Sequence, residues 1–214
     1  MNLLLIDATS AKIEFAVYKD KEEFIRHTLN ESENADSLIF NIYKICSEKD
    51  FALIDLDYVS ISNGPGSFTG LRISSAIAKA ICLASDAKLI EVNSLDVLAN
   101  KADTQKVIIP LIYSNMRTNE FYYSKFRKDN GFNRLDEYST ALIGDILNEE
   151  DFFISNNNIE DFAKGVFHSE SSNIDSLYQL TENYVSQNKF SDYNTSEPNY
   201  MKEFVPLKSQ KKLL

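Results

Sequence analysis

The sequence predicts an α/β protein made of two halves, each built around its own β-sheet. Short apolar runs alternate with helical periods through the first hundred residues, and a second set of strand patterns begins after the polar stretch 100–106. A hydrophobic content of 43% over 214 residues is sufficient for a packed core.

The first half opens with three strand patterns. Leu3–Ile6 is a short apolar run, residues 13–17 alternate apolar and polar side chains, and Phe24–Leu29 completes a meander. The elements that follow are a helix over Ala35–Ser47, a strand over Tyr58–Ser62, a turn over Asn63–Gly66, a helix through Leu71, Ile77 and Leu83, a strand over Lys88–Val92 and a helix over Ser94–Asn100. This order, βββαβαβα, is typical of a ribonuclease-H-like half, in which helices pack against a mixed sheet.

The polar stretch 100–106 predicts a boundary, which divides the chain into residues 1–102 and 103–214. In the second half, Val107–Tyr113, Glu120–Phe126 and Phe152–Ser155 predict strands, and Ile159–Val166 predicts a short helix. Residues 169–198, rich in Asn, Ser, Asp and Glu, give no clear pattern. The second half thus resembles a reduced copy of the first, as in a small member of the actin, sugar-kinase and heat-shock-ATPase (ASKHA) architecture.

Charge and composition exclude several classes of protein. The 22 Lys and Arg residues against 32 Asp and Glu residues give a net charge of -10, which repels phosphate backbones and excludes a general nucleic-acid coat protein. No apolar run approaches the roughly 20 residues that span a bilayer, and the N-terminus lacks the core of a signal peptide. A cytoplasmic location without membrane contact is therefore expected.

Three of the six glycines fall within Gly64–Arg72, at positions 64, 66 and 70. A strand, a glycine turn and a helix N-terminus can bind an anion, and Ser67 or Thr69 can cap the helix. The segment lacks both the Lys-Ser/Thr ending of a P-loop and the spacing of a dinucleotide site. A structural turn or a partner surface is therefore favoured over a phosphate cradle, which stays open as an alternative.

The segment Asn63-Gly-Pro-Gly-Ser-Phe-Thr-Gly-Leu-Arg-Ile73 resembles the signature of the TsaB (YeaZ) family of bacterial tRNA-modification proteins. Ile6-Asp-Ala-Thr-Ser10, Arg117-Thr-Asn-Glu-Phe-Tyr122 and Glu197-Pro-Asn-Tyr-Met-Lys202 resemble further family motifs. The segment departs from the family at Ile73–Ala76, where Gly-Val often follows the isoleucine.

The resemblance implies an inactive paralogue of TsaD. Such a protein acts as a non-catalytic scaffold that binds a TsaD-like partner and, with a TsaE-like ATPase, helps to place threonylcarbamoyl on the adenosine next to the tRNA anticodon. It implies contact with tRNA only through the complex and no cofactor of its own, with ATP or ADP only at the interface of the assembled complex. A homodimer of the isolated chain stays open.

Catalytic, cofactor-binding and metal-binding residues are not expected. His27 and His168 lack the His-x-x-x-His spacing of a metal-binding helix, and Cys46 and Cys82 lie in apolar helical stretches where a thiol stays protonated. The alternative function is a stand-alone actin-fold ATPase or small-molecule kinase. In that case Asp7 would orient a metal-bound water, and the loop at residues 8–11 would hold phosphate, although it carries alanines where active relatives usually have glycine.

The helix over Ala35–Ser47 is apolar on two faces, which is more than one core contact needs. The helix that begins near Ser67 offers small side chains that allow close approach. We therefore predict a partner interface formed by both helices; its residues are Leu38, Ile39, Phe40, Ile42, Tyr43, Ile45, Ser67, Phe68, Leu71, Arg72 and Ser75. The alternative is an ordinary core helix under the second half. The lysine-rich tail 202–212 is either a solvated end or a tRNA contact.

Overall fold

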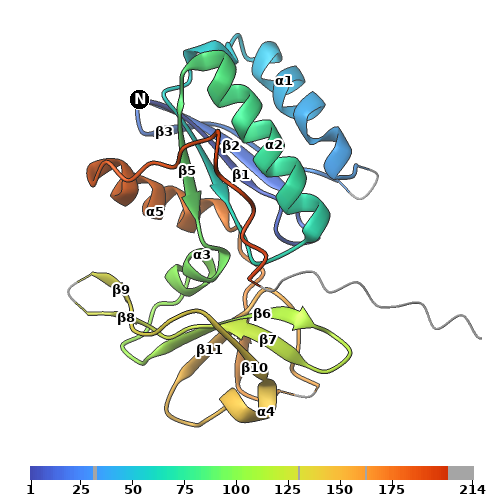
Figure 1. Cartoon of the computed structure of the whole chain (residues 1–214), viewed down its shortest axis with the longest axis vertical. Coiled ribbons are helices and arrows are strands. Elements are labelled where there is room, and N and C mark those ends of the chain that lie inside the picture. Colours follow the sequence, from blue (N-terminus) through green and yellow to red (C-terminus); the bar gives the residue numbers. More distant parts are fainter. Residues whose placement is uncertain (31–32, 130, 162, 202–214) are drawn as a thin grey trace, which may run out of the picture.

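The computed structural model describes residues 1–30, 33–129, 131–161 and 163–201. Two β-sheets stack along the long axis of the molecule, and a short helix, α3 (Ser94–Asn100), lies between them (Figure 1). This arrangement confirms the predicted α/β fold with two sheets.

The first sheet has the strand order β3-β2-β1-β4-β5. Its strands are β1 (Asn2–Asp7), β2 (Glu14–Lys19), β3 (Glu22–Thr28), β4 (Tyr58–Ser62) and β5 (Lys88–Val92). The first three strands are antiparallel, whereas β4 and β5 run parallel to β1. The side chains of residues 3–6 are fully buried, so both faces of the central strand must be covered.

Helices cover the two faces of the first sheet. On one face, α1 (Leu38–Glu48) and α2 (Phe68–Ser85) pack against Leu4 and Ile6; on the other, α5 (Ile174–Ser186) packs against Leu3 and Leu5. By length and composition alone α2 could cross a membrane, but a core helix meets the same criterion, and about half of α2 is buried against the sheet.

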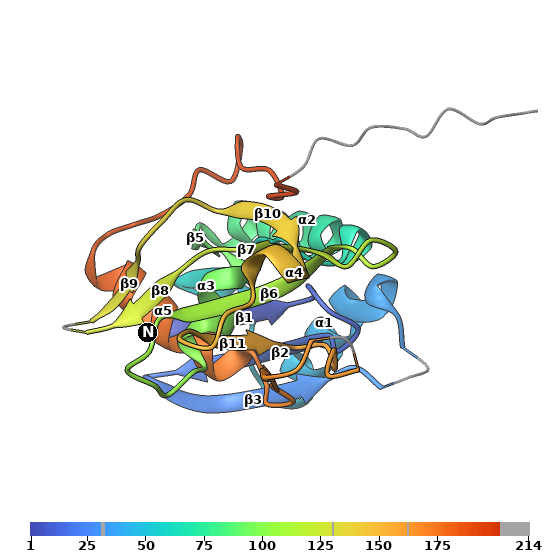
Figure 2. The same ribbon diagram turned by 90° about the horizontal axis from the view of Figure 1, so that it is seen from below.

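The second sheet has the order β10-β7-β6-β11-β12, and β8 pairs with β6 and β9. Its elements are β6 (Ile108–Asn115), β7 (Glu120–Tyr123), β8 (Phe126–Lys128), β9 (Phe132–Arg134), β10 (Ser139–Leu142), β11 (Phe152–Ser155) and β12 (Val166–His168), with the short helix α4 (Ile143–Ile146). The predicted strand 120–126 is divided at Ser124, whose buried hydroxyl lies 3.0 Å from the carbonyl oxygen of Asp136 and donates to its Oδ1 at 2.8 Å. Seen from below, the β8–β9 hairpin projects to one side (Figure 2).

The predicted helix over Ile159–Val166 is wrong. The described residues before Val166 form turns, and Val166 begins β12, which pairs in parallel with β11. Ile159 and Ala163 are buried in the core of the second sheet, so their apolar character reflects this burial and not a helical period. Gly165, with φ of +84°, turns the chain into the strand.

Helix α5 was not predicted from the polar stretch 169–198. Its Ile174, Leu177 and Leu180 are buried against the first sheet at helical spacing, and the polar residues around them obscured this period. Since α5 returns to the first sheet, the late part of the sequence covers the early part. The division at residue 102 stays a prediction about folding units.

Candidate functional site

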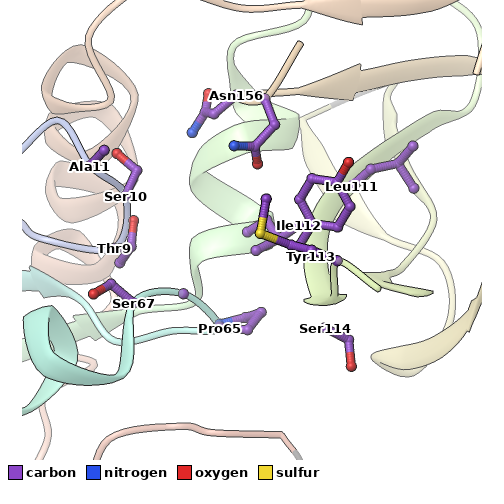
Figure 3. A pocket seen from close by; sticks show the side chains of 13 residues that line it. Thr9, Ser10, Ala11, Pro65, Ser67, Leu111, Ile112, Tyr113, Ser114 and Asn156 are labelled. Carbon is purple, nitrogen blue, oxygen red and sulfur yellow. The ribbon is translucent and has the colours of Figure 1, made fainter. Parts of the chain in front are cut away.

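A cleft of about 470 Å³ opens between the two halves. Thr9, Ser10 and Ser67 lie on the side of the first sheet, Leu111, Ile112, Tyr113 and Ser114 lie on the side of the second, and Asn156 stands between them at one end (Figure 3). The lining therefore combines hydroxyl and amide groups with apolar side chains.

Asp7, at the end of β1, is buried beneath this cleft, with 1% of its surface exposed. Its Oδ1 accepts hydrogen bonds from the Thr9 amide at 3.0 Å and the Thr9 hydroxyl at 2.7 Å. Its Oδ2 accepts from Ser62 Oγ at 2.6 Å and from Asn173 Nδ2 at 3.1 Å. Four donors use the acceptor sites that a carboxylate normally offers, so Asp7 fixes the loop instead of presenting a free oxygen to a metal-bound water.

The glycine segment is packed against the same loop. The Ser67 amide donates to the Thr9 carbonyl at 2.8 Å, and Ser67 Oγ accepts from the Gly70 amide at 3.2 Å, which caps α2. A Cβ at Gly66 would lie 2.6 Å from the Thr9 carbonyl oxygen, and one at Gly70 would lie 1.8 Å from that of Ala8. The glycines therefore permit close contact between α2 and the β1–β2 turn, which supports the structural interpretation of the segment.

Lys101 joins the two halves beside the cleft. Its Nζ donates to Asn173 Oδ1 at 2.9 Å, to Asn156 Oδ1 at 3.2 Å and to the Ser171 carbonyl at 2.7 Å. Burial lowers the pKa of the Lys101 amino group to about 8. Because Asn173 also donates to Asp7, one polar network links β1, α3 and the chain that follows β11.

The other titratable candidates lie apart from one another. His27 packs on the ring of Phe15, with centroids 5.4 Å apart, whereas His168 lies on the second sheet with Nε2 3.2 Å from the Asn156 carbonyl. Burial raises the pKa of both the Cys46 and the Cys82 thiols to about 11, so they stay protonated at neutral pH. Within the described part of the chain, no group of three His, Cys, Asp or Glu side chains is placed to hold a metal ion.

Helix α1 divides the predicted interface residues between two faces. Leu38 and Ile42 are fully buried against the first sheet, and Ile45 is half-buried at the edge of that core. The opposite face presents three large apolar side chains to solvent: Ile39 is 42% exposed, Phe40 64% and Tyr43 63%.

Helix α2 divides its candidates in the same way. Leu71 and Ser75 are buried, whereas Ser67, Phe68 and Arg72 are exposed at its N-terminal end. The Arg72 guanidinium lies over the ring of Phe68 at 3.9 Å. Among the predicted interface residues, Ile39, Phe40 and Tyr43 of α1 and Ser67, Phe68 and Arg72 of α2 thus remain exposed, and we call these six residues together the outer helix face.

Sequence reasoning missed two residues next to this face. Ile54, which follows α1 and is 60% exposed, lies with Tyr43 around an apolar groove, and Tyr200 packs on Phe68. The motif at 197–202 pointed to Tyr200 without indicating a contact. The lysine-rich tail 202–212 lies outside the described residues.

Comparisons with known proteins identify relatives of this chain. Residues 30–186 match the family model described as TsaD, tRNA N6-adenosine threonylcarbamoyltransferase. The tRNA threonylcarbamoyladenosine biosynthesis protein TsaB of Buchnera aphidicola subsp. Schizaphis graminum is 30% identical over 142 residues, which cover 66% of this chain and 68% of that protein.

The chain belongs to the TsaB (YeaZ) family. Escherichia coli TsaB is 25% identical over 70% of this chain and 65% of its own length, so the aligned region spans about two thirds of these relatives. A Pseudomonas aeruginosa crystal structure, described as similar to peptidase YEAZ, superimposes with a TM-score of 0.77 at 16% identity over 94% of this chain and 99% of that one. This likeness shows that the fold of TsaB-family proteins extends over nearly the whole chain.

Proposed function

We propose that the chain acts in the biosynthesis of threonylcarbamoyladenosine in tRNA, as a non-catalytic scaffold that binds a TsaD-like paralogue and works with a TsaE-like ATPase. The names of its TsaB relatives support the pathway. The scaffold role and the partners are inferred from family membership together with the surface described above.

The observation that carries the scaffold role is the outer helix face. Ile39, Phe40 and Tyr43 are not needed by the core, because the opposite side of α1 already packs on the sheet. A cluster of large apolar side chains kept in solvent is typical of a protein–protein contact. A paralogue that carries equivalent helices would provide a matching apolar surface.

A stand-alone ATPase or kinase finds less support in the site. The carboxylate of Asp7 already accepts four hydrogen bonds, and the Ser67 amide, which a phosphate cradle would need free, is bonded to Thr9. We propose that ATP or ADP binds only at the interface of the assembled complex. Because the net charge is -10, we expect tRNA to be held through the complex. We further propose that the chain works in the cytoplasm and without membrane contact.

Co-purification tests the proposal. Phe40→Glu places a charge on the outer helix face, where burial against a partner would leave it unpaired. We expect this variant to keep its melting temperature and to lose co-purification with the TsaD-like protein of the same cell. The exposed Phe167→Glu, on the second sheet, is the matched control and should bind normally. If Phe40→Glu still assembles while the fold is intact, the outer helix face is not the interface.

A further inference from the structure

The last described segment, residues 191–201, crosses from the first half of the molecule to the second. It begins at the edge of the first sheet, where Ser191 forms a β-bridge with Leu89, and it runs beside α2 toward the second sheet (Figure 1). Seen from below, it stays on the side of the molecule that carries α2 and β10 (Figure 2).

Its middle part is held by the glycine segment and by α2. The Lys79 amino group donates to the Ser196 carbonyl, and the Asn63 side-chain amide donates to the Glu197 carbonyl at 3.1 Å. The Asn199 amide donates to the Asn63 carbonyl at 2.9 Å. A Cβ at Gly64 would lie 2.3 Å from the Asn199 carbonyl oxygen, so a side chain at position 64 would push this segment away.

Its end is held by both halves through one residue. The Tyr200 hydroxyl accepts a hydrogen bond from Arg72 Nε at 3.1 Å, and the Tyr200 ring packs on Phe68 with centroids 5.2 Å apart. The Tyr200 carbonyl accepts a hydrogen bond from the Tyr122 hydroxyl of β7 at 3.2 Å. The next side chain, Met201, packs on the core between α3 and the second sheet.

We propose that residues 191–201 act as a clasp that fixes the spacing of the two halves on the side of α2, with Tyr200 as its joint. The side chain of Tyr200 is bound to α2 and its main chain to β7, so the clasp limits opening of the cleft lined by the β1–β2 turn and β6. Helix α3 holds the halves together from the inside, whereas the clasp holds them along their outer edge. The clasp needs no partner protein and does not depend on the proposed function.

Hydrogen exchange on the full-length chain tests both contacts of Tyr200, the one with α2 and the one with β7. Arg72→Ala removes the bond from α2, and Tyr122→Phe removes only the hydroxyl on β7. We expect each variant to raise the exchange rate of amides in residues 191–201 by about three- to tenfold. This is the increase in local opening that follows from the loss of one hydrogen bond. Tyr18→Phe, which removes a hydroxyl bonded to Glu23 at the β3 side of the first sheet, opposite the β5 edge where the clasp begins, should leave those rates unchanged. Two results would contradict the proposed role of Tyr200. One is wild-type exchange in residues 191–201 as fast as in an unstructured peptide, and the other is no change in exchange in Arg72→Ala and Tyr122→Phe.

Spin labels at Ser10→Cys and Met116→Cys measure the cleft itself, because both positions line it. Cys46 and Cys82 are buried with a raised pKa, so they should not react with the label. We expect one narrow distance distribution in the otherwise unchanged chain, and a broader or longer one when Arg72→Ala and Tyr122→Phe are combined. If the combined variant gives the same distance distribution as the chain without these two substitutions, the clasp does not limit opening of the cleft, whatever the exchange rates show.

Discussion

At the scale of single residues, Asp7 has the position of a catalytic carboxylate, but it holds loops together by hydrogen bonds. Its position at the end of β1 predicted a role in orienting water in the alternative ATPase. The structure instead surrounds its carboxylate with donors from Thr9, Ser62 and Asn173. Three segments far apart in the sequence therefore depend on one buried acceptor.

Asp7→Ala should reduce the free energy of unfolding by about 2–4 kcal/mol, because buried donors on Ser62 and Asn173 lose a charged acceptor. Urea denaturation measures this loss. Ser47→Ala, which removes the hydroxyl of an exposed residue near the end of α1, is the control and should change it by less than about 0.5 kcal/mol. The wild type should show no ATP turnover above background; steady turnover that disappears in Asp7→Ala would restore the enzyme alternative.

Gly70 offers a second test at this scale. Within a helix, Gly→Ala normally stabilises by about 1 kcal/mol. At position 70 the new Cβ would lie 1.8 Å from the Ala8 carbonyl oxygen, so α2 must shift, and we expect Gly70→Ala to destabilise the fold by about 1–3 kcal/mol. Gly144→Ala in α4 has no atom within 4 Å of its Cβ and should be neutral or stabilising. Thermal unfolding of the two variants compares them; a stabilised Gly70→Ala would contradict the close contact.

At the scale of elements, α1 has two apolar faces with different physical roles. One face, with Ile42, is dehydrated against the sheet, whereas the other, with Tyr43, stays in solvent. The periodicity of the sequence identified both faces, but it could not assign them, because a helix wheel looks the same for a core contact and for an interface.

Single alanine substitutions separate these faces. Ile42→Ala leaves a cavity in the core and should cost about 2–5 kcal/mol of unfolding free energy. Tyr43→Ala, one residue further along the same helix, should cost about 0.5 kcal/mol or less in the isolated chain. Denaturation midpoints measure both. Equal losses would mean that the outer face is also packed in solution.

At the scale of the whole molecule, the two halves are joined by a polar network around Lys101 as well as by the apolar packing of α3. Burial lowers the pKa of Lys101 from its ordinary 10.5 to about 8. Between these pH values the unfolded chain holds a proton that the folded chain has lost. The contribution of Lys101 to the free energy of unfolding therefore rises as pH increases from about 8 toward 10.5.

This pH dependence should be absent in Lys101→Met. We expect the wild type to gain stability relative to that variant between pH 7.5 and 9.5, in urea titrations at roughly half-unit steps. Ionisation of Cys46 and Cys82 lowers the free energy of unfolding above about pH 9. This effect is the same in the wild type and in Lys101→Met, so it cancels when their unfolding free energies are subtracted. The exposed Lys125→Met serves as control. For Lys125→Met the difference in unfolding free energy from the wild type should not change with pH. If the difference for Lys101→Met does not change with pH either, the Lys101 amino group keeps its ordinary pKa.

Local sequence patterns predicted the first sheet, the helices α1 to α3, and the strands β6 and β11, because each carries a strong local period or a buried apolar run. It also identified the family through the segment 63–73. Helix α5 does carry a helical period in Ile174, Leu177, Leu180 and Tyr184, which the polar composition of its segment obscured. The clasp could not be predicted, because it is held by contacts over a hundred residues apart in sequence. The assignment of Ile42 to the core and of Phe40 to solvent also came only from the tertiary structure. Local sequence patterns show which side chains are apolar. Whether an apolar side chain is buried depends on which distant segments of the chain pack against it.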